Sequence, residues 1–367
     1  MLRSLAVEAL VVRGFRNFVA VDLELGSGLN VFSGANGQGK TNLLEAMYVL
    51  ATSRSFRTPR LSELVRNGAE DATIRGRVRE DGAAREQVVA LRRGVRSARI
   101  DGKRPATLAA YALRTPAVVF HPGALTLTAG GGSERRKLLD RVALYRSAAV
   151  LGASDAYTKA MRARQRVLDV RGENERDLDG WEEIAAEHGT ALSNARAEAA
   201  EVLLAAAAGA FERIGPVGTV LTGRYERSSP VLASEFRAEL ARRRRKDRAR
   251  GSASIGPHRD DVALELSQKS VRAMASQGQH RAVVLALKLA EIEVVTAARG
   301  LRPLLLLDDV SSELDRERTA ALFSALSEQS CQVLMTTTRP ELIVTRTPSG
   351  VEARRDFEVV SGQISGR

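Results

Sequence analysis

A glycine-rich turn near the N-terminus carries the residue types that bind nucleotide phosphates. Residues 34–41 read Gly-Ala-Asn-Gly-Gln-Gly-Lys-Thr and fit the Walker A pattern G-x-x-x-x-G-K-[ST]. Backbone N–H groups of such a turn surround phosphate oxygens, because glycine permits the required dihedral angles and a close approach. We expect Lys40 to reach the β- and γ-phosphates and the Thr41 hydroxyl to bind Mg²⁺. The residues of this predicted site are Gly34, Ala35, Asn36, Gly37, Gln38, Gly39, Lys40 and Thr41.

Two adjacent carboxylates follow an apolar run and supply the other half of a nucleotide-hydrolysing site. Residues 303–309 read Pro-Leu-Leu-Leu-Leu-Asp-Asp. A continuous apolar run is typical of a parallel strand covered on both faces, and ligands bind beyond the carboxyl ends of such strands. We expect Asp308 to hold Mg²⁺ through water together with Thr41, and Asp309 to polarise the attacking water. Lys40, Asp308 and Asp309 are therefore the predicted catalytic residues.

A third set of residues has the character of an anion site. Residues 276–279 form a small polar turn directly before the helical run 282–298, and helix N-termini attract anions. Because the chain holds one phosphate loop, we expect this turn to serve the nucleotide of a second subunit. Its predicted contacts are Ser276, Gln277, Gly278 and Gln279. Arg13 and Asn17, in a turn before the phosphate loop, are also expected near the nucleotide, with a solvated hairpin tip as the equal alternative.

The segments around these residues have the patterns of strands and one helix. Residues 29–33 have strand character and run into the phosphate loop, and residues 42–50 follow it with helical periodicity. Other segments alternate or are short and apolar, with Asp-Gly pairs as turn signals. These segments are residues 4–12, 19–25, 72–79, 86–92, 96–100, 115–120 and 217–225. We expect an α/β fold in which an antiparallel, arginine-rich layer accompanies the parallel strands.

A helical insertion separates the two halves of the predicted site. Residues 133–211 are rich in alanine, arginine, glutamate and leucine at helical spacing, and residues 172–179 interrupt them as the turn of a hairpin. Lys40 and Asp308 lie 268 residues apart, which is more than a compact nucleotide-binding domain needs. We therefore expect three segments: an ATPase head over residues 1–132 and 251–367, and an inserted, mainly helical arm over residues 133–250.

The net charge of +12 is concentrated in two segments. Residues 54–104 carry +7 and residues 241–250 carry +6, so the remainder carries −1. Localised positive charge is typical of a nucleic-acid-binding surface, and the low aromatic content of 4% favours backbone contact with duplex over stacking of single strands. The predicted DNA-binding residues are Arg54, Arg57, Arg60, Arg242, Arg243, Arg244 and Arg245. A helix is expected over residues 231–246, and a solvated face is the alternative interpretation of its arginine run.

The sequence also limits the compartment. It has a single cysteine, Cys331, and no apolar run approaches the ~20 residues that a membrane-spanning helix needs. We expect a cytoplasmic protein with no disulfide bond and no membrane partner.

Taken in order, these motifs resemble the ATPase heads of the ABC and SMC families. The resemblance rests on residues 34–41, 276–279, 304–309 and 312–315, the last reading Ser-Glu-Leu-Asp. The short arm, Ser-Arg-Ser-Phe-Arg at residues 53–57 and Gly-Pro-His-Arg-Asp-Asp at residues 256–261 are together similar to the RecF family of DNA replication and repair proteins. That resemblance covers nearly the whole chain.

The resemblance implies a fold, an activity and partners. The fold is an ABC/SMC-type P-loop ATPase head, with mixed and antiparallel sheets around the P-loop helix and an inserted helical arm. Two chains would clamp two ATP molecules with Mg²⁺, so that Ser276 and Gly278 of one subunit face the phosphates held by Lys40 of the other, with Asp315 at the interface. Such a homodimer would bind double-stranded and gapped DNA, help to load recombinase with RecO and RecR, and hydrolyse ATP slowly, stimulated by DNA, as a switch.

Two departures from transporter heads bear on mechanism. Asp309 stands where transporters and most SMC heads have glutamate, and this shorter side chain favours slow hydrolysis. Residues 336–338 are three threonines where transporters have a histidine. The alternative function is that of an ABC-type ATPase subunit in another DNA-repair or transport complex.

Overall fold

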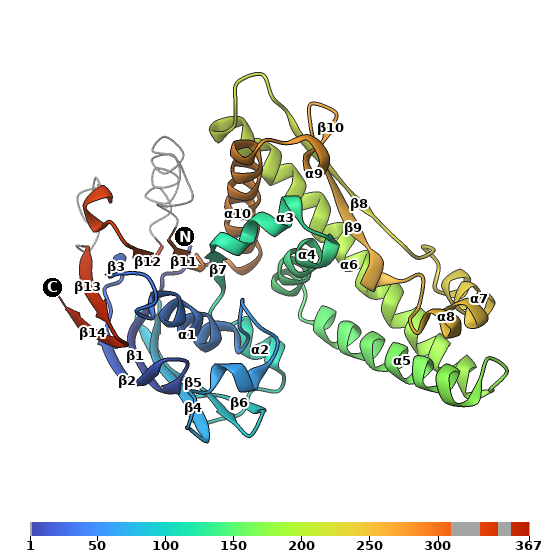
Figure 1. Cartoon of the computed structure of the whole chain (residues 1–367), viewed down its shortest axis with the longest axis horizontal. Coiled ribbons are helices and arrows are strands. Elements are labelled where there is room, and N and C mark those ends of the chain that lie inside the picture. Colours follow the sequence, from blue (N-terminus) through green and yellow to red (C-terminus); the bar gives the residue numbers. More distant parts are fainter. Residues whose placement is uncertain (1, 310–330, 344–353, 367) are drawn as a thin grey trace. The chain divides into compact units, whose positions relative to one another are not determined.

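A computed structural model of the chain describes residues 2–309, 331–343 and 354–366 (Figure 1). The chain divides into two compact units. Unit 1 comprises Met1–Ala124 and Glu291–Arg367, and unit 2 comprises Leu125–Ala290. Unit 2 is a continuous segment between the two parts of unit 1, and it starts before and ends after the segment 133–250 expected for the arm. The Ser-Glu-Leu-Asp motif at residues 312–315, including Asp315, lies outside the described residues.

The first sheet of unit 1 contains the strands that carry the phosphate loop and the paired carboxylates. Its order is β14-β13-β3-β12-β11-β7, and every neighbouring pair is parallel except β13 with β14. The strands are β3 Leu29–Ser33, β7 Ala117–Phe120, β11 Leu304–Asp308, β12 Val333–Thr337, β13 Arg355–Val360 and β14 Gln363–Gly366. All residues of β7, β11 and β12 are buried, which explains the apolar runs at residues 117–120, 304–307 and 333–335.

The second sheet of unit 1 is antiparallel, in the order β2-β1-β4-β5-β6. Its strands are β1 Leu5–Phe15, β2 Phe18–Glu24, β4 Asp71–Glu80, β5 Ala83–Arg92 and β6 Val95–Ile100. The predicted arginine-rich layer is confirmed, and the arginines of β4 are paired with glutamates. On β4, Arg75 pairs with Glu86, Arg77 with Glu24, and Arg79 with Glu8.

Helix α1, Lys40–Thr52, packs against strands of both sheets. This position between two apolar surfaces explains why its sequence is apolar almost all round, with 11 of its 13 residues buried. The predicted arrangement of a mixed and an antiparallel sheet around the P-loop helix is confirmed. Short helices complete the unit: η1 Leu61–Leu64, α2 Leu108–Ala112, η2 Pro122–Leu125 at its edge and η4 Pro340–Leu342.

Unit 2 is built on the predicted helical hairpin. The long helices α5, Ala149–Arg171, and α6, Asp177–Ile214, pack along each other and reverse direction at Gly172, whose φ of 95° suits glycine (Figure 1). Helix α4, Gly132–Arg146, packs against both. The remaining helices are α3 Thr126–Ala129, α7 Ala233–Arg242, α8 Arg244–Arg250, η3 Pro257–Arg259, α9 Val271–Met274 and α10 Gln277–Arg299, whose last turns belong to unit 1.

Pairing of strands explains why residues 251–290 group with the arm. Strand β9, Asp261–Leu266, pairs on one side with β8, Leu221–Glu226, and on the other with β10, Lys269–Ser270. The Gly-Pro-His-Arg-Asp-Asp motif holds this join: the buried Asp260 accepts hydrogen bonds from Ser193 on α6 and Tyr225 on β8. Among the residues that the structure describes, no helix has the length and apolar character needed to cross a membrane.

Candidate nucleotide-binding site

The phosphate loop lies between the end of β3 and the start of α1, and two of its glycines are in close contact with neighbouring chain. A Cβ atom on Gly34 would lie 2.3 Å from the carbonyl oxygen of Val359 on β13. Gly39 has a φ of 113°, and a Cβ there would lie 2.5 Å from Nδ2 of Asn17. Glycine at these positions therefore lets the loop pack tightly against the neighbouring chain, where a side chain would clash.

Lys40 is folded back over the loop. Its Nζ donates hydrogen bonds to the carbonyl oxygens of Gly34 (2.6 Å) and Ala35 (2.8 Å), and the residue is 7% exposed. Burial lowers the pKa of the ammonium group, and the charges of Asp309 and Asp308 oppose that shift. Two carbonyl oxygens neutralise a buried cation poorly, so the site favours an anionic ligand beside Lys40.

Asp308 and Thr41 meet although they are far apart in the sequence. The Thr41 hydroxyl donates to Oδ1 of Asp308 at 2.9 Å, across a separation of 267 residues. The carboxyl group is 5% exposed; burial raises its pKa, hydrogen bonds from Thr336 and Thr41 lower it, and Asp309 raises it further. A buried carboxylate next to a hydroxyl is an oxygen-only donor set, which fits Mg²⁺.

Thr336, at the end of β12, connects the two carboxylate residues. Its hydroxyl donates to Oδ1 of Asp308 at 2.8 Å and accepts the backbone N–H of Asp309 at 3.0 Å. Asp309 has a φ of 48°, so the chain turns sharply out of β11 at this residue. The sequence pointed to residues 336–338 only as a departure from transporters. The contact arises because Asp308 and Thr336 are paired in register on neighbouring strands.

Of the two candidates before the loop, only Asn17 contacts it. Asn17 donates to the carbonyl oxygen of Gln38 at 3.2 Å and accepts from the Asn42 side chain at 2.8 Å. Arg13 instead forms an ion pair with Asp22 on β2 at 2.8 Å, because both side chains project from the same face of the hairpin. The prediction that Arg13 lies by the nucleotide thus lacks support from its contacts.

The turn between β13 and β14 is a contact of the phosphate loop that sequence reasoning missed. The backbone N–H of Ser361 donates to Oε1 of Gln38 at 2.6 Å, and that of Gly362 donates to the Gln38 carbonyl oxygen at 3.1 Å. Gln38 is thereby held from three positions in the chain, which fixes the loop before any ligand binds.

A buried carboxylate on α1 ties the loop helix to the basic segment after it. Glu45 is completely buried and accepts hydrogen bonds from Arg16 (2.8 Å), Ser55 (2.5 Å) and Arg57 (3.0 Å). Arg57 also donates to the side chain of Asn42 at 2.8 Å. Arg57 was predicted to contact DNA, and in this structure its guanidinium is engaged within unit 1.

The turn at residues 276–279 forms the start of α10, in unit 2. The Ser276 backbone N–H donates to the Gln279 side chain at 2.8 Å, and the Gln279 N–H donates to the Ser276 hydroxyl at 3.3 Å. This reciprocal arrangement is a capping box. A small polar turn at a helix N-terminus is therefore present as expected, and its role toward a second subunit's nucleotide remains a prediction.

The arginines predicted to bind DNA differ in how they are used. Arg54 and Arg60 are exposed in unit 1. The helix expected over residues 231–246 is broken at Arg243, so the arginine run is divided between α7 and α8. Within that run, Arg242 and Arg243 pair with Glu239, Arg244 pairs with Glu182 and Asp179, and Arg245 is exposed.

Comparison with known proteins gives one consistent family. The model of the RecF/RecN/SMC N terminal domain matches residues 6–356. "DNA replication and repair protein RecF" of Myxococcus xanthus (strain DK1622) is 41% identical over 348 residues, covering 91% of each chain. The protein of the same name from Anaeromyxobacter sp. (strain Fw109-5) is 40% identical over 366 residues, covering 97% of this chain and 98% of its own.

Solved structures agree. Two structures of "the recombination mediator protein RecF" in the RecFOR pathway, one with ATPrS and one with ATP, match with a TM-score of 0.88; they are 27% and 28% identical and cover 100% of this chain and 99% of theirs. An SMC head bound to the C-winged helix domain of ScpA matches with a TM-score of 0.55 at 17% identity, which shows a shared fold.

Proposed function

The chain belongs to the RecF family of DNA replication and repair proteins, within the RecF/RecN/SMC N terminal domain family, and on this premise we propose that ATP controls its binding to DNA. The proposed role is in recombinational repair and replication-fork maintenance. ATP would be hydrolysed slowly, with stimulation by DNA, so that hydrolysis acts as a switch. The RecFOR pathway named for its solved relatives supports RecO and RecR as partners in loading recombinase onto gaps.

One observation carries the ATP part of this proposal: the contact between Thr41 and Asp308 beside Lys40. The loop of residues 34–41 would hold the phosphates, with Lys40 replacing its two carbonyl partners by phosphate oxygens. Thr41 and Asp308 would hold Mg²⁺, which neutralises charge on the phosphates. Asp309 would orient the attacking water as a weak general base, and Asn17 would support the loop through Gln38.

Sedimentation velocity tests the function directly. We expect the full-length protein with Mg²⁺ to be a monomer without nucleotide and a dimer with ATP, and to sediment with duplex or gapped DNA only when ATP is present. Lys40→Met is the matched control, because it leaves the exposed basic residues unchanged. DNA binding that is equal with and without ATP, or equal in the Lys40→Met protein, would contradict ATP control.

The composite site needs its own test. We propose that residues 276–279 of one subunit complete the nucleotide site of the other, so Ser276→Arg should leave ATP binding intact and abolish dimerisation and hydrolysis. A mixture of Ser276→Arg and Lys40→Met chains forms heterodimers with one intact site. Partial recovery of hydrolysis in the mixture is the expected result.

Absence of recovery in detected heterodimers has two possible causes. Either hydrolysis requires both sites together, or the two motifs do not meet across the interface. Mixing wild type with each single variant separates them. Half-active wild-type heterodimers alongside an inactive double-mutant mixture would refute the composite site.

The alternative of an ABC-type subunit in another DNA-repair or transport complex gains no specific observation from the described residues.

A further inference from the structure

Helix α8 turns four basic side chains toward solvent, and we call Arg245, Lys246, Arg248 and Arg250 the α8 basic face. All four residues are exposed. Within the described part of the chain, none of them forms an ion pair or a side-chain hydrogen bond with another residue. They differ in this from Arg242, Arg243 and Arg244 just before them, which are all paired with carboxylates.

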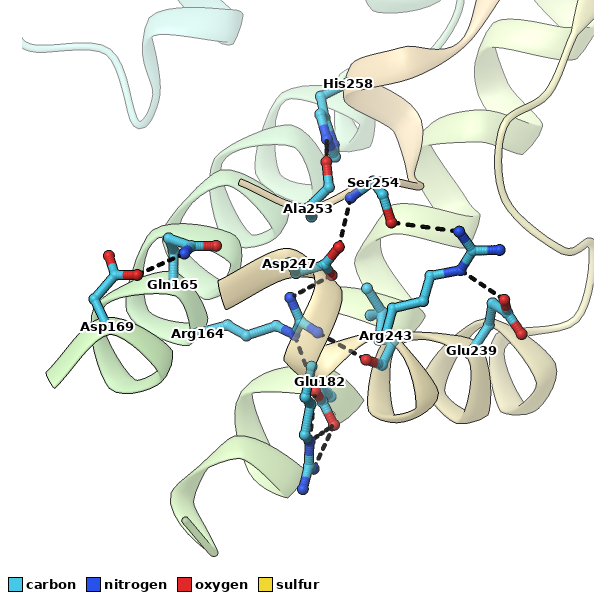
Figure 2. A network of polar contacts seen from close by, with 12 residues as sticks. Arg164, Gln165, Asp169, Glu182, Glu239, Arg243, Asp247, Ala253, Ser254 and His258 are labelled. Carbon is cyan, nitrogen blue, oxygen red and sulfur yellow. Dashed lines mark hydrogen bonds and ion pairs between the residues drawn. The ribbon is translucent and has the colours of Figure 1, made fainter. Parts of the chain in front are cut away.

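The opposite side of α8 is anchored in a buried ionic network (Figure 2). Asp247, on the same helix, is completely buried; it accepts a hydrogen bond from Arg164 at 3.0 Å and from the backbone N–H of Ser254 at 2.9 Å. Arg164 on α5 is also completely buried, and it donates to Glu182 on α6 at 2.9 Å and to the Leu240 carbonyl oxygen on α7 at 2.7 Å. One guanidinium thus joins four helices.

The carboxylates of this network form their ion pairs with arginines outside the α8 basic face. Glu182 accepts from Arg164 and Arg244, Asp247 accepts from Arg164, and Glu239 accepts from Arg243. Among the residues that the structure describes, no carboxylate lies within ion-pair distance of the four side chains of the α8 basic face. The α8 basic face thus differs from the exposed arginines of β4, because each of those arginines has a glutamate partner.

Burial of this network is costly, because charged groups lose hydration, and apolar side chains of similar volume commonly give equal or greater stability. Arg164 instead contributes directional hydrogen bonds, which fix the position of α8 relative to α5, α6 and α7. A fixed cationic surface loses less conformational freedom when it binds an anion than a mobile one does.

We propose that the α8 basic face contacts the phosphate backbone of duplex DNA, and that Arg243 and Arg244 in the same run are structural. This inference rests on the proposed DNA-binding function and assigns part of it to a defined surface. The four residues extend over about 7.5 Å of helix, at 1.5 Å per residue, which matches about two phosphates of one strand at 3.4 Å per nucleotide. No aromatic residue lies in α8, so contact without base readout is expected.

The test compares two variants of equal charge. The face variant carries Arg245→Gln, Lys246→Gln, Arg248→Gln and Arg250→Gln. The control variant carries Lys159→Gln, Arg162→Gln, Arg213→Gln and Lys269→Gln, which are exposed basic residues dispersed over the same unit. Binding of a 30-bp duplex is measured with ATP and Mg²⁺ between 50 and 300 mM salt. Thermal melts of both variants should match wild type, since all eight side chains are exposed.

We expect the slope of log K against log salt to become less steep by about 2 per bound subunit in the face variant, because each lost phosphate contact removes about 0.9. The slope of the control variant should stay near that of wild type. Equal slopes in the face variant and wild type, with wild-type binding intact, would overturn this inference and leave the proposed function standing. Equal losses in both variants would reduce the effect to net charge and also overturn it. Failure of wild type to bind duplex with ATP would refute the proposed function itself.

Discussion

Replacement of Thr336 by valine tests whether one hydroxyl organises both carboxylate residues of the nucleotide site. Valine has the shape of threonine without the hydroxyl, and position 336 is completely buried, so packing is conserved. The change removes the 2.8 Å hydrogen bond to Asp308 and the 3.0 Å acceptor of the Asp309 N–H. A hydrogen bond to a charged group contributes about 1.5–3 kcal/mol, and an unsatisfied buried N–H costs about 1–3 kcal/mol.

The expected kinetic effect follows from the pKa of Asp308. Burial already raises this pKa, and the bond from Thr336 is the largest influence that lowers it, so the valine variant should have a higher pKa still. A carboxyl group with a raised pKa stays protonated to higher pH, and the protonated form is a poor ligand for Mg²⁺. The acid limb of the pH dependence of hydrolysis should therefore move to higher pH. Loss of about 1.5–3 kcal/mol corresponds to a fall in rate of roughly 10- to 100-fold.

The assay is steady-state ATP hydrolysis from pH 5.5 to 9 at several Mg²⁺ concentrations, with Thr336→Ser as the control. Serine keeps the hydroxyl, so it should keep the wild-type pH profile, whereas valine should also need more Mg²⁺ for half-maximal rate. ATP binding without Mg²⁺ should be unchanged in both. If valine and serine variants show the same rate and the same acid limb, Thr336 only fills space and the reasoning is refuted.

Three further changes give separate tests. Asp308→Asn should abolish hydrolysis yet raise the melting temperature of the ligand-free protein at pH 7. Burial raises the pKa of Asp308 in the folded state, so the stability that this group contributes is present at low pH and is lost as pH rises above 3.8 through the folded pKa. A melting temperature that falls in the variant would contradict this. Lys40→Met should weaken ATP binding, measured by calorimetry, by roughly 10- to 100-fold, since a hydrogen bond to a charged group contributes about 1.5–3 kcal/mol. Near-normal affinity would remove Lys40 from the phosphate site. Glu45→Leu should lower the free energy of unfolding, measured by denaturant titration, by about 3–5 kcal/mol because Arg16 and Arg57 lose a buried partner. The control Glu86→Leu breaks an exposed pair with Arg75 and should lower it by at most about 1 kcal/mol.

Much of the fold follows from local patterns in the sequence, together with the family resemblance. The apolar run before Asp308 had to be a buried strand, and the glycine-rich loop had to lie between a strand and a helix, so the presence of both strands in a parallel sheet was predictable. The hairpin of α5 and α6 was also predictable, because its periodicity is interrupted once, at Gly172. These features depend on interactions within one element or on a motif of fixed geometry.

The missed features depend on pairing between distant segments. Thr336 meets Asp308 only because β12 lies beside β11 in a particular register, and Ser361 meets Gln38 only because β13 lies beside β3. Arg13 was expected either near the nucleotide or in a solvated hairpin tip, and the register of β1 on β2 places it beside Asp22. Nothing in the spacing of these residues along the chain indicates such contacts, since a shift of one residue in register reverses the face of every side chain.

The arginine run shows why charge counted along the chain overstates a binding surface in a protein with 49 arginines among 56 basic residues. Residues 241–250 carry +6 by count, yet Arg242, Arg243 and Arg244 are paired with carboxylates of unit 2. Asp247 is paired with Arg164, so four basic side chains of the segment are left without an ion pair within the described ranges of the chain. Arg57 in the other basic segment is held by Glu45 in the same way. Arginines that balance buried carboxylates cannot release counterions from DNA without breaking those pairs. Exposure without an internal partner is therefore the criterion that separates contact residues from structural ones, and on α8 it selects Arg245, Lys246, Arg248 and Arg250.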